Sequence, residues 1–391
     1  MSIDIEDGPQ KHGVITRPLT PIELTAGIGT GSVALLMLGL QPLILGALAD
    51  ENRLDASGIG SAATLEMLTL GLTTGLLASL APPRHLRPVN TAAALALAAC
   101  NVLGMTAHGT WFVMSRGGAG LAAGVMVWVT VSTLTRALRP DRMAGIFLTV
   151  QTLAQAGLAS LLPLTLMARY GANGGLAALG ALAAVSVLAS PWLPAGLVEL
   201  PRSEAGSGRL PARALLGLAL VFFQMAGIVG LWVFVEQLGA GLRISARVAQ
   251  LAVAASLGAQ VTGSAAATLS SNRLPAMAVL LAACLANIAV IRVLGHSIDS
   301  GTYLGAILLF GFLWMFCMPF QTRLLIDLDP SRRAALLLAA VQLLGSAAGP
   351  AFTSMFAKPA SLAGVLNADA ALFAAAAGCI LLLAGRRWLV S

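Results

Sequence analysis

The chain contains 391 residues, of which 58% are hydrophobic and only 10% are charged, and its mean hydropathy is +0.87. A water-soluble domain carries about 25% charged residues, so this composition excludes ordinary soluble enzymes, disordered scaffolds and nucleic-acid-binding modules. The formal net charge of +7 comes from scattered arginines, since only two of the 23 basic residues are lysine, and this is typical of loops at a membrane surface.

The amino-terminal residues 1–21 are polar and contain Asp4, Glu6, Asp7 and Pro9. A signal peptide requires an apolar stretch, which this segment lacks. We therefore expect a short cytoplasmic tail before the first membrane span.

Twelve apolar runs follow the tail. The hydrocarbon core of a bilayer is about 30 Å thick and requires about 20 residues of helix. The runs have these approximate bounds: 22–48, 56–81, 90–107, 110–134, 143–168, 175–195, 212–239, 247–270, 275–296, 302–326, 334–356 and 368–385. Lipid offers no partners to backbone polar groups, and the alternating strands of a barrel are absent, so the runs are predicted to be helices. The predicted fold class is an all-α integral membrane protein.

Basic residues are distributed unequally between the two sides that this topology defines. With the amino terminus inside, the outer connections hold five of them: Arg53, Arg169, Arg243, Arg247 and Lys358. Arg116 and Arg292 lie within runs, and the other sixteen of the 23 lie on the inner side. Cytoplasmic loops are enriched in Lys and Arg. We therefore expect a multi-pass protein of the cell (inner) membrane with both termini in the cytoplasm.

The longest inner connection lies near the midpoint of the chain. Residues 198–211 are rich in Gly, Pro and charge, which is typical of a flexible linker. The linker would separate two pseudo-symmetric six-helix bundles, at 22–197 and 212–391, the second ending in a short cytoplasmic tail. A weak internal repeat supports a duplication, because Val150–Gln151 recurs as Val341–Gln342. Two parallel six-span repeats with a substrate site between them are a transporter architecture.

Two motifs give the chain a resemblance to the major facilitator superfamily of secondary transporters over essentially everything after residue 21. The fourth run has the spacing Arg-x-x-x-Gly-x-x-x-Gly and the eleventh has Gly-x-x-x-Gly-Pro, carried by Arg116, Gly120, Gly124, Gly345, Gly349 and Pro350. The resemblance implies that runs 1, 4, 7 and 10 line a central cavity and that runs 2, 5, 8 and 11 gate it.

The chain departs from the family pattern in two places. The inner loop between runs 2 and 3 has Ser79 where the family carries an acidic residue. The fifth run lacks the Gly-x-x-x-Gly-Pro element that is associated with exporters, which disfavours efflux.

Small residues four positions apart allow two membrane helices to pack closely, and an internal proline frees a backbone carbonyl. We expect these five residues to form gating seams or a hinge: Gly120, Gly124, Gly345, Gly349 and Pro350. The alternative is that they only pack helices together.

Ionisable residues inside the membrane are costly and mark functional sites. Glu66 and Arg116 fall at similar depths in runs 2 and 4, where they can pair. Burial favours the protonated form of a carboxylic acid, whereas a nearby guanidinium favours the ionised form. Glu66 is therefore predicted to carry the coupling proton, with Arg116 as its switchable partner. A static ion-pair brace, or no contact at all, are the alternatives.

Aromatic and amide side chains concentrate in the runs that the resemblance assigns to the cavity. An aromatic wall suits a flat organic solute, amides recognise hydroxyl or carboxyl groups, and Arg116 suits an anion. The predicted substrate-binding residues are Gln41, Arg116, Gln151, Gln224, Trp232, Trp314, Phe316 and Gln342. The alternative for the aromatic residues is a stripe that packs between helices.

The sequence contains no catalytic, metal-binding or nucleotide-binding motif, and its four cysteines lack metal-ligand spacing and are expected to be buried free thiols. We therefore expect that the protein is not an enzyme and that it binds no metal ion and no cofactor. The predicted function is alternating-access transport of a small organic solute, such as an aromatic or other organic acid, coupled to protons. Lipid is the expected surrounding, nucleic acid is not expected as a partner, and a monomer is expected. The alternatives are an exporter of apolar or amphipathic compounds and a non-transporting receptor or assembly factor.

Overall fold

The computed structural model describes residues 18–138, 140–197, 210–270, 273–329, 333–357 and 362–388. Within these residues every named secondary-structure element is a helix. Most of the predicted tail (1–17), most of the predicted linker (198–209) and residues 389–391 lie outside the described residues.

The helices of the two chain halves are as follows. The first half contains α1 (Pro21–Ala34), α2 (Leu36–Asp50), α3 (Ala56–Leu80), α4 (Leu86–Thr106), α5 (Gly109–Leu134), α6 (Pro140–Leu161), η1 (Leu162–Leu164), α7 (Leu166–Ser186) and η2 (Val187–Trp192). The second half contains α8 (Ala212–Val233), α9 (Val235–Gly241), α10 (Ala246–Ser270), α11 (Ala276–Leu294), α12 (Ser300–Leu328), α13 (Arg333–Leu336), α14 (Leu338–Ser354) and α15 (Ala363–Trp388).

Ten helical segments of the described chain are long and apolar enough to cross a membrane. They correspond to every predicted run except the eighth and the eleventh, which α10 and α14 occupy as helices of 25 and 17 residues. The prediction of an all-α, multi-pass membrane protein is confirmed.

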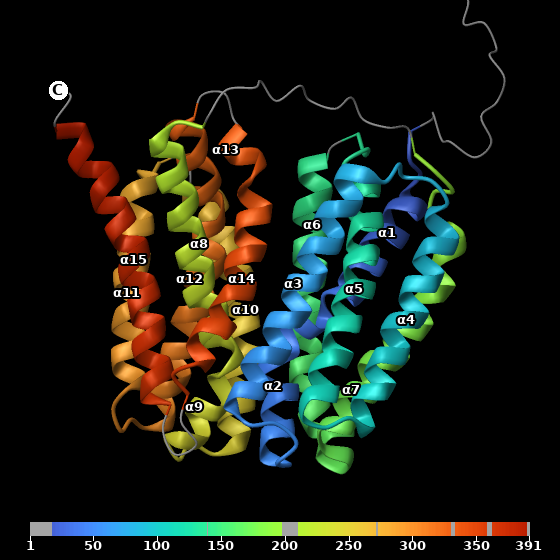
Figure 1. Cartoon of the computed structure of the whole chain (residues 1–391), viewed down its shortest axis with the longest axis horizontal. Helices are drawn as coiled ribbons and strands as arrows, with labels where there is room; N and C mark the ends of the chain where they lie inside the picture. The colour runs from blue at the N-terminus through green and yellow to red at the C-terminus, as the bar shows by residue number, and fades with distance from the viewer. Residues whose placement is uncertain are drawn as a thin grey trace, which may run out of the picture.

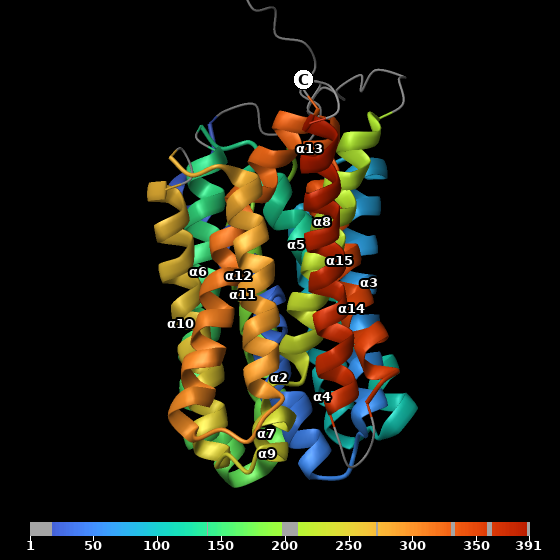
Figure 2. The ribbon, with the colours of Figure 1, turned by 90° about the vertical axis from the view of Figure 1, so that its left-hand side faces the viewer.

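The helices form two bundles that lie side by side, α1–α7 in one and α8–α15 in the other (Figure 1). Between the bundles, α3 packs against α14 and α6 packs against α10. In Figure 1 the start of α1 and the end of α15 lie at the same end of the molecule, which we call the terminal side. The other end, where α2 leads into α3, is the opposite side. Figure 2, turned by 90°, shows α10, α11, α12 and α15 running between the same two sides.

The first and seventh predicted runs are both broken helices. The first is divided into α1 and α2 at Leu35, whose carbonyl accepts a hydrogen bond from Gln155 Nε2 at 2.7 Å. The seventh is divided into α8 and α9 at Phe234, and the hydroxyl of Tyr303 donates to the adjacent carbonyl of Val235 at 2.7 Å. Side chains from other helices therefore satisfy backbone groups near both breaks, as lipid-embedded backbone requires.

The predicted glycine seams lie between helices of the same bundle. A Cβ atom at Gly120 or Gly124 would collide with backbone carbonyls of α3, and one at Gly345 or Gly349 would collide with carbonyls of α8. The absent side chains let the backbones come into van der Waals contact. Gly263 and Gly311 produce the same close approach between α10 and α12, which we did not predict.

Several predicted boundaries are wrong by a few residues. The third helix begins at Leu86 rather than 90, because Pro88 is tolerated in a first turn. The sixth begins before 175: α7 is kinked at Gly171 (φ 58°), where the carboxylate of Glu51 accepts from Ala172 N at 2.7 Å. The twelfth begins at Ala363 rather than 368, so Asn367 lies within the helix and Asp369 lies beyond its first turn.

The bundles are joined most closely toward the opposite side. There α2 packs against α8, α9 and α10, whereas α1 makes no comparable packing with any described helix of the second bundle. At Gly60 of α3, a Cβ atom would collide with Ser354 and with the carbonyl of Pro350 on α14. In Figure 1 the two ribbons meet around α2 and α9. The structure is therefore closed between the bundles toward the opposite side.

Candidate functional site

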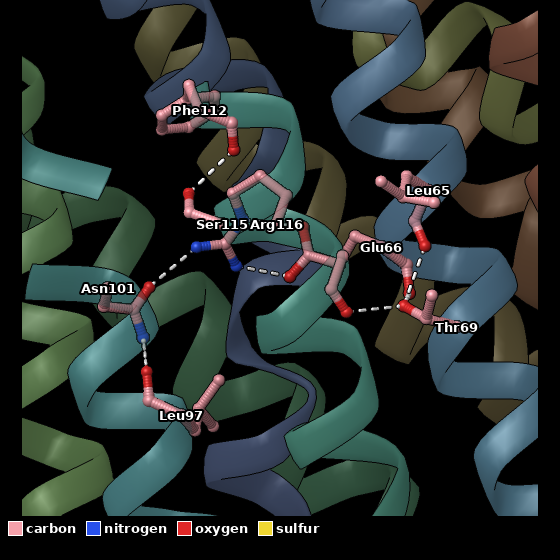
Figure 3. A network of polar contacts seen from close by, with 9 residues as sticks. Leu65, Glu66, Thr69, Leu97, Asn101, Phe112, Ser115 and Arg116 are labelled. Atoms are coloured by element: carbon pink, nitrogen blue, oxygen red, sulfur yellow. Dashed lines mark hydrogen bonds and ion pairs between the residues drawn. The ribbon is translucent and has the colours of Figure 1, made fainter. Parts of the chain in front are cut away.

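Glu66 and Arg116 form a buried ion pair between α3 and α5 (Figure 3). Arg116 Nε lies 3.1 Å from Glu66 Oε2 and Nη2 lies 2.5 Å from Oε1, a bidentate arrangement. The third donor, Nη1, bonds Asn101 Oδ1 of α4 at 2.9 Å, and the Asn101 amide donates to Leu97 O at 3.0 Å. Arg116 is completely buried and Glu66 is 3% exposed.

This network joins three helices of one bundle. Each of the three guanidinium nitrogens of Arg116 already donates to a side chain within that bundle, so a solute carboxylate has no open guanidinium edge to bind in this conformation. The arrangement is that of an ionic brace for α3, α4 and α5. Asn101, which completes it, was missed because nothing in its local sequence distinguishes it from an exposed helix residue.

An aromatic pair lies where the two bundles meet toward the opposite side. The Trp232 and Trp314 rings, from α8 and α12, are edge to face with centroids 5.8 Å apart. Trp232 Nε1 donates to Leu38 O of α2 at 3.1 Å, across the interface between the bundles. Leu38 is the residue whose carbonyl would accept from the N–H of residue 42, but that residue is Pro42. Trp232 therefore satisfies a carbonyl that Pro42 frees.

Several predicted binding residues carry buried polar atoms with no partner among the described residues. Both amide atoms of Gln41, Oε1 of Gln151, Nε2 of Gln224 and Nε1 of Trp314 are unpaired. These side chains come from α2, α6, α8 and α12 and are at most 6% exposed. Buried polar groups are normally hydrogen-bonded, so unpaired ones indicate a place for water or a ligand.

Three glutamines form a chain inside the second bundle. Gln321 Nε2 donates to Gln224 Oε1 at 3.0 Å, and Gln342 Nε2 donates to Gln321 Oε1 at 2.8 Å. Gln342 also lies 3.2 Å from the sulfur of Met318. The chain joins α8, α12 and α14, so Gln342 is not paired with its repeat counterpart Gln151. Gln321 was missed because it lies near the inner end of the predicted tenth run, where a polar residue is unremarkable.

Phe316 belongs to an aromatic row along α12. Its ring stacks on Phe312 with centroids 5.4 Å apart and tilts toward Phe320 at 5.3 Å. The side chain is half-buried. This geometry fits the alternative of a packing stripe at Phe316.

A surface cavity of about 800 Å³ lies at the opposite side, lined by the loops and helix ends of both bundles rather than by the α3–α14 contact at Gly60 and Ser354. Its polar lining is mainly acidic or amide and includes Asp50, Asp55, Glu236, Gln237 and Gln250. The sequence analysis did not assign this cavity, because its walls come from loops and helix ends that are far apart in the chain.

Among the described residues no group of three His, Cys, Asp or Glu side chains is arranged to hold a metal ion. The four cysteines are free; three are buried and Cys100 is only half-buried, which corrects the expectation for that residue.

The fold and these sites define a class: a membrane protein of two six-helix bundles with a closed interface and unpaired polar groups along it. No protein-family model matches the chain, and no curated protein matches it in sequence. Several solved structures are similar to it in fold. The nucleoside transporter NupG superposes with a TM-score of 0.71 at 11% identity, over 94% of this chain and 99% of that one.

A bacterial homologue of the human lysosomal transporter Spinster, solved in an inward-facing conformation, superposes with a TM-score of 0.62 at 15% identity, over 93% of this chain and 95% of that one. At such low identity the similarity establishes the architecture. The chain has the major facilitator fold, as the sequence motifs predicted.

Proposed function

We propose that the protein is a secondary transporter that moves a small organic solute between its two bundles by alternating access. The observation that carries this proposal is the interface itself, closed toward the opposite side and containing unpaired polar atoms from both bundles. A static assembly would be expected to pair such groups, whereas a transporter must leave them available for a passing solute. The basic residues on the terminal side support a cytoplasmic orientation for that side.

The solute we favour is flat, aromatic and able both to donate and to accept hydrogen bonds. The Trp232–Trp314 pair offers an aromatic face, Trp314 Nε1 and Gln224 Nε2 are free donors, and the Gln41 amide provides both functions. An organic acid, which the sequence suggested, would rely on Arg116, but that guanidinium is occupied by Glu66 and Asn101. Neutral heteroaromatic compounds are therefore the better candidates.

Nucleosides are the first compounds to test, because they combine a flat ring with several donors and acceptors and because NupG, which shares the fold, is a nucleoside transporter. A ligand that binds the folded state raises its melting temperature. We expect stabilisation of the purified protein by at least one nucleoside or neutral heteroaromatic compound, and none by benzoate-type acids. The Trp314→Phe variant keeps an aromatic ring, although a smaller one, and removes the free N–H, so it should weaken that stabilisation.

The outcome that contradicts this assignment is stabilisation by aromatic acids that is lost in an Arg116→Gln variant but retained in Trp314→Phe. Absence of any flux of the stabilising compound into proteoliposomes above empty vesicles would reject transport and favour a receptor with a transporter-like body.

We further propose that a proton gradient drives the transport, and Glu66 is the first carboxylate to test because it is buried within a membrane span. The contacts of Glu66 favour a structural role, since both of its carboxylate oxygens are held by Arg116. The coupling role for this pair is tested by Glu66→Gln. If Glu66 carries the coupling proton, the variant will lose gradient-driven accumulation but keep solute exchange. If the pair is a structural brace, gradient-driven accumulation and solute exchange will both decrease in proportion to the amount of folded protein.

A further inference from the structure

Asp369 is a buried carboxylate that the transport proposal does not use. It lies on α15, six residues after Ala363 and thus about 9 Å along the helix from its first residue. Its side chain is completely buried. Neither Oδ1 nor Oδ2 has a hydrogen-bond partner among the described residues.

The surroundings of Asp369 are apolar and closely packed. A Cβ atom at Gly230 of α8 would lie 2.5 Å from Asp369 Oδ1 and 2.9 Å from the methyl group of Thr353 on α14. The hydroxyl of Thr353 bonds Gly349 O of its own helix at 3.1 Å. One helical turn further along α15, the ring of Phe373 covers Gly227 in the same way. Asp369 therefore lies in the seam between α8, α14 and α15.

The helices packed against α15 supply no counter-charge. In their described residues, α14 contains no titratable side chain and α8 contains only Arg213, near its first residue. On α11 the titratable groups are Cys284 and Arg292, and Arg292 is exposed and lies 3.4 Å from Asn367 Oδ1. Cys379 lies on α15 itself. None of these groups forms a hydrogen bond or ion pair with Asp369.

An ionised carboxylate without donors is strongly disfavoured in such a place, and it normally takes up a proton or a cation. A metal cation would require several oxygen ligands. Gly230 and the methyl group of Thr353 lie beside Asp369 Oδ1, and no group of three His, Cys, Asp or Glu side chains in the described residues is arranged to hold a metal ion.

We propose that Asp369 is a proton-binding site of the second bundle, loaded in the conformation described here. The proton would keep the α8–α14–α15 seam neutral and therefore closely packed. Since α8 also carries Trp232, which bonds Leu38 across the interface, proton release would alter the position of a helix that holds the opposite side closed. This use in the transport cycle rests on the proposed function, whereas proton binding rests on the burial alone.

Infrared spectroscopy of the purified full chain tests the site directly, because the carbonyl stretch of a protonated carboxylic acid is separate from the bands of a carboxylate. The comparison is between wild type and Asp369→Asn, which mimics the neutral acid in shape. Glu236, whose Oε1 is also unpaired, can give its own band, so the readout is the difference spectrum of the two proteins. The control is Asp299→Asn, at an exposed N-cap.

At pH 7, with or without sodium, we expect the difference spectrum for Asp369→Asn to contain a protonated-acid band and that for Asp299→Asn to contain carboxylate bands. Loss of carboxylate bands in Asp369→Asn would overturn the proposal, and so would a protonated-acid band that sodium removes.

A second measurement does not require the variant to fold. Dicyclohexylcarbodiimide reacts with protonated carboxyl groups in apolar surroundings, and peptide mass spectrometry locates the label. We expect wild-type protein to be labelled at Asp369 and not at Glu66, and an unlabelled Asp369 would contradict the proposal. If wild type labels at Asp369 but transports no solute in proteoliposomes, the proposed function fails while the proton site stands.

Discussion

Arg116 shows how one buried charge is accommodated in a membrane helix. Its Nε and Nη2 donate to Glu66 and its Nη1 donates to Asn101, so the charge is neutralised and one donor on each of its three nitrogens is used. A buried ion pair is weak evidence for stability, but removal of one partner leaves an uncompensated charge. The two partners should therefore be strongly coupled in their effects on folding.

Single substitutions of the pair are expected to destabilise the protein by about 3–5 kcal/mol each, because either one leaves a lone buried charge. The double variant Glu66→Gln/Arg116→Gln should recover much of that loss, since two amides can bond each other. The measurement is the free energy of unfolding in detergent of the wild type, the two single variants and the double variant. Arg247→Gln, at an exposed arginine, is the control and should have no effect. Additive losses in the double variant would show that the pair is not a brace.

At the scale of the elements, the broken helices contain backbone carbonyls that accept hydrogen bonds from side chains far away in the chain. Pro42 leaves the carbonyl of Leu38 without its helical donor, and Trp232 of the other bundle supplies one at 3.1 Å. The stability of the interface thus depends on a proline and a tryptophan that are far apart in the chain. Neither residue alone reveals this contact in the sequence.

A double-mutant cycle tests this dependence. Trp232→Phe removes the indole N–H and should cost about 1–3 kcal/mol, because a buried carbonyl is left unsatisfied. In a Pro42→Ala background the new N–H of residue 42 can bond Leu38 O, and the cost of Trp232→Phe should become smaller. The measurement is again the unfolding free energy. An equal cost in both backgrounds would mean that Trp232 stabilises the protein only by packing.

The parts of the fold that hydrophobicity controls could be predicted from the sequence. Span length, Arg-rich loops and glycines four residues apart are local signals, and they located the helices and the Gly120–Gly124 and Gly345–Gly349 seams. The Glu66–Arg116 contact was also accessible, since both residues are conspicuous in apolar runs and their depths match.

The remainder depends on which helix faces which, and a single sequence of Ala, Leu and Gly contains little information about that. Gln321 and Asn101 look like ordinary interfacial or helical residues until their partners on other helices are known. Asp369 was not singled out, although it lies inside α15 and is completely buried. The cavity at the opposite side is formed by segments from both halves and has no sequence signature.

At the scale of the whole molecule, the proposed transport requires the two bundles to rock about their interface. Gly60 is the contact that most clearly holds the opposite side closed, because any side chain there would collide with Ser354 and Pro350 of α14. Gly75 lies on the same helix toward the terminal side, and a Cβ atom there would meet nothing within 4 Å. Gly60→Leu and Gly75→Leu are therefore a matched pair.

Distances between spin labels in cysteine-free protein would measure the rocking directly. The positions are exposed: Ser57 and Ser245 report on the opposite side, and Ala78 and Ala340 report on the terminal side. We predict that Gly60→Leu lengthens the Ser57–Ser245 distance and shortens the Ala78–Ala340 distance, while Gly75→Leu changes neither. A longer Ser57–Ser245 distance with an unchanged Ala78–Ala340 distance would mean that the interface only frays, and it would contradict alternating access.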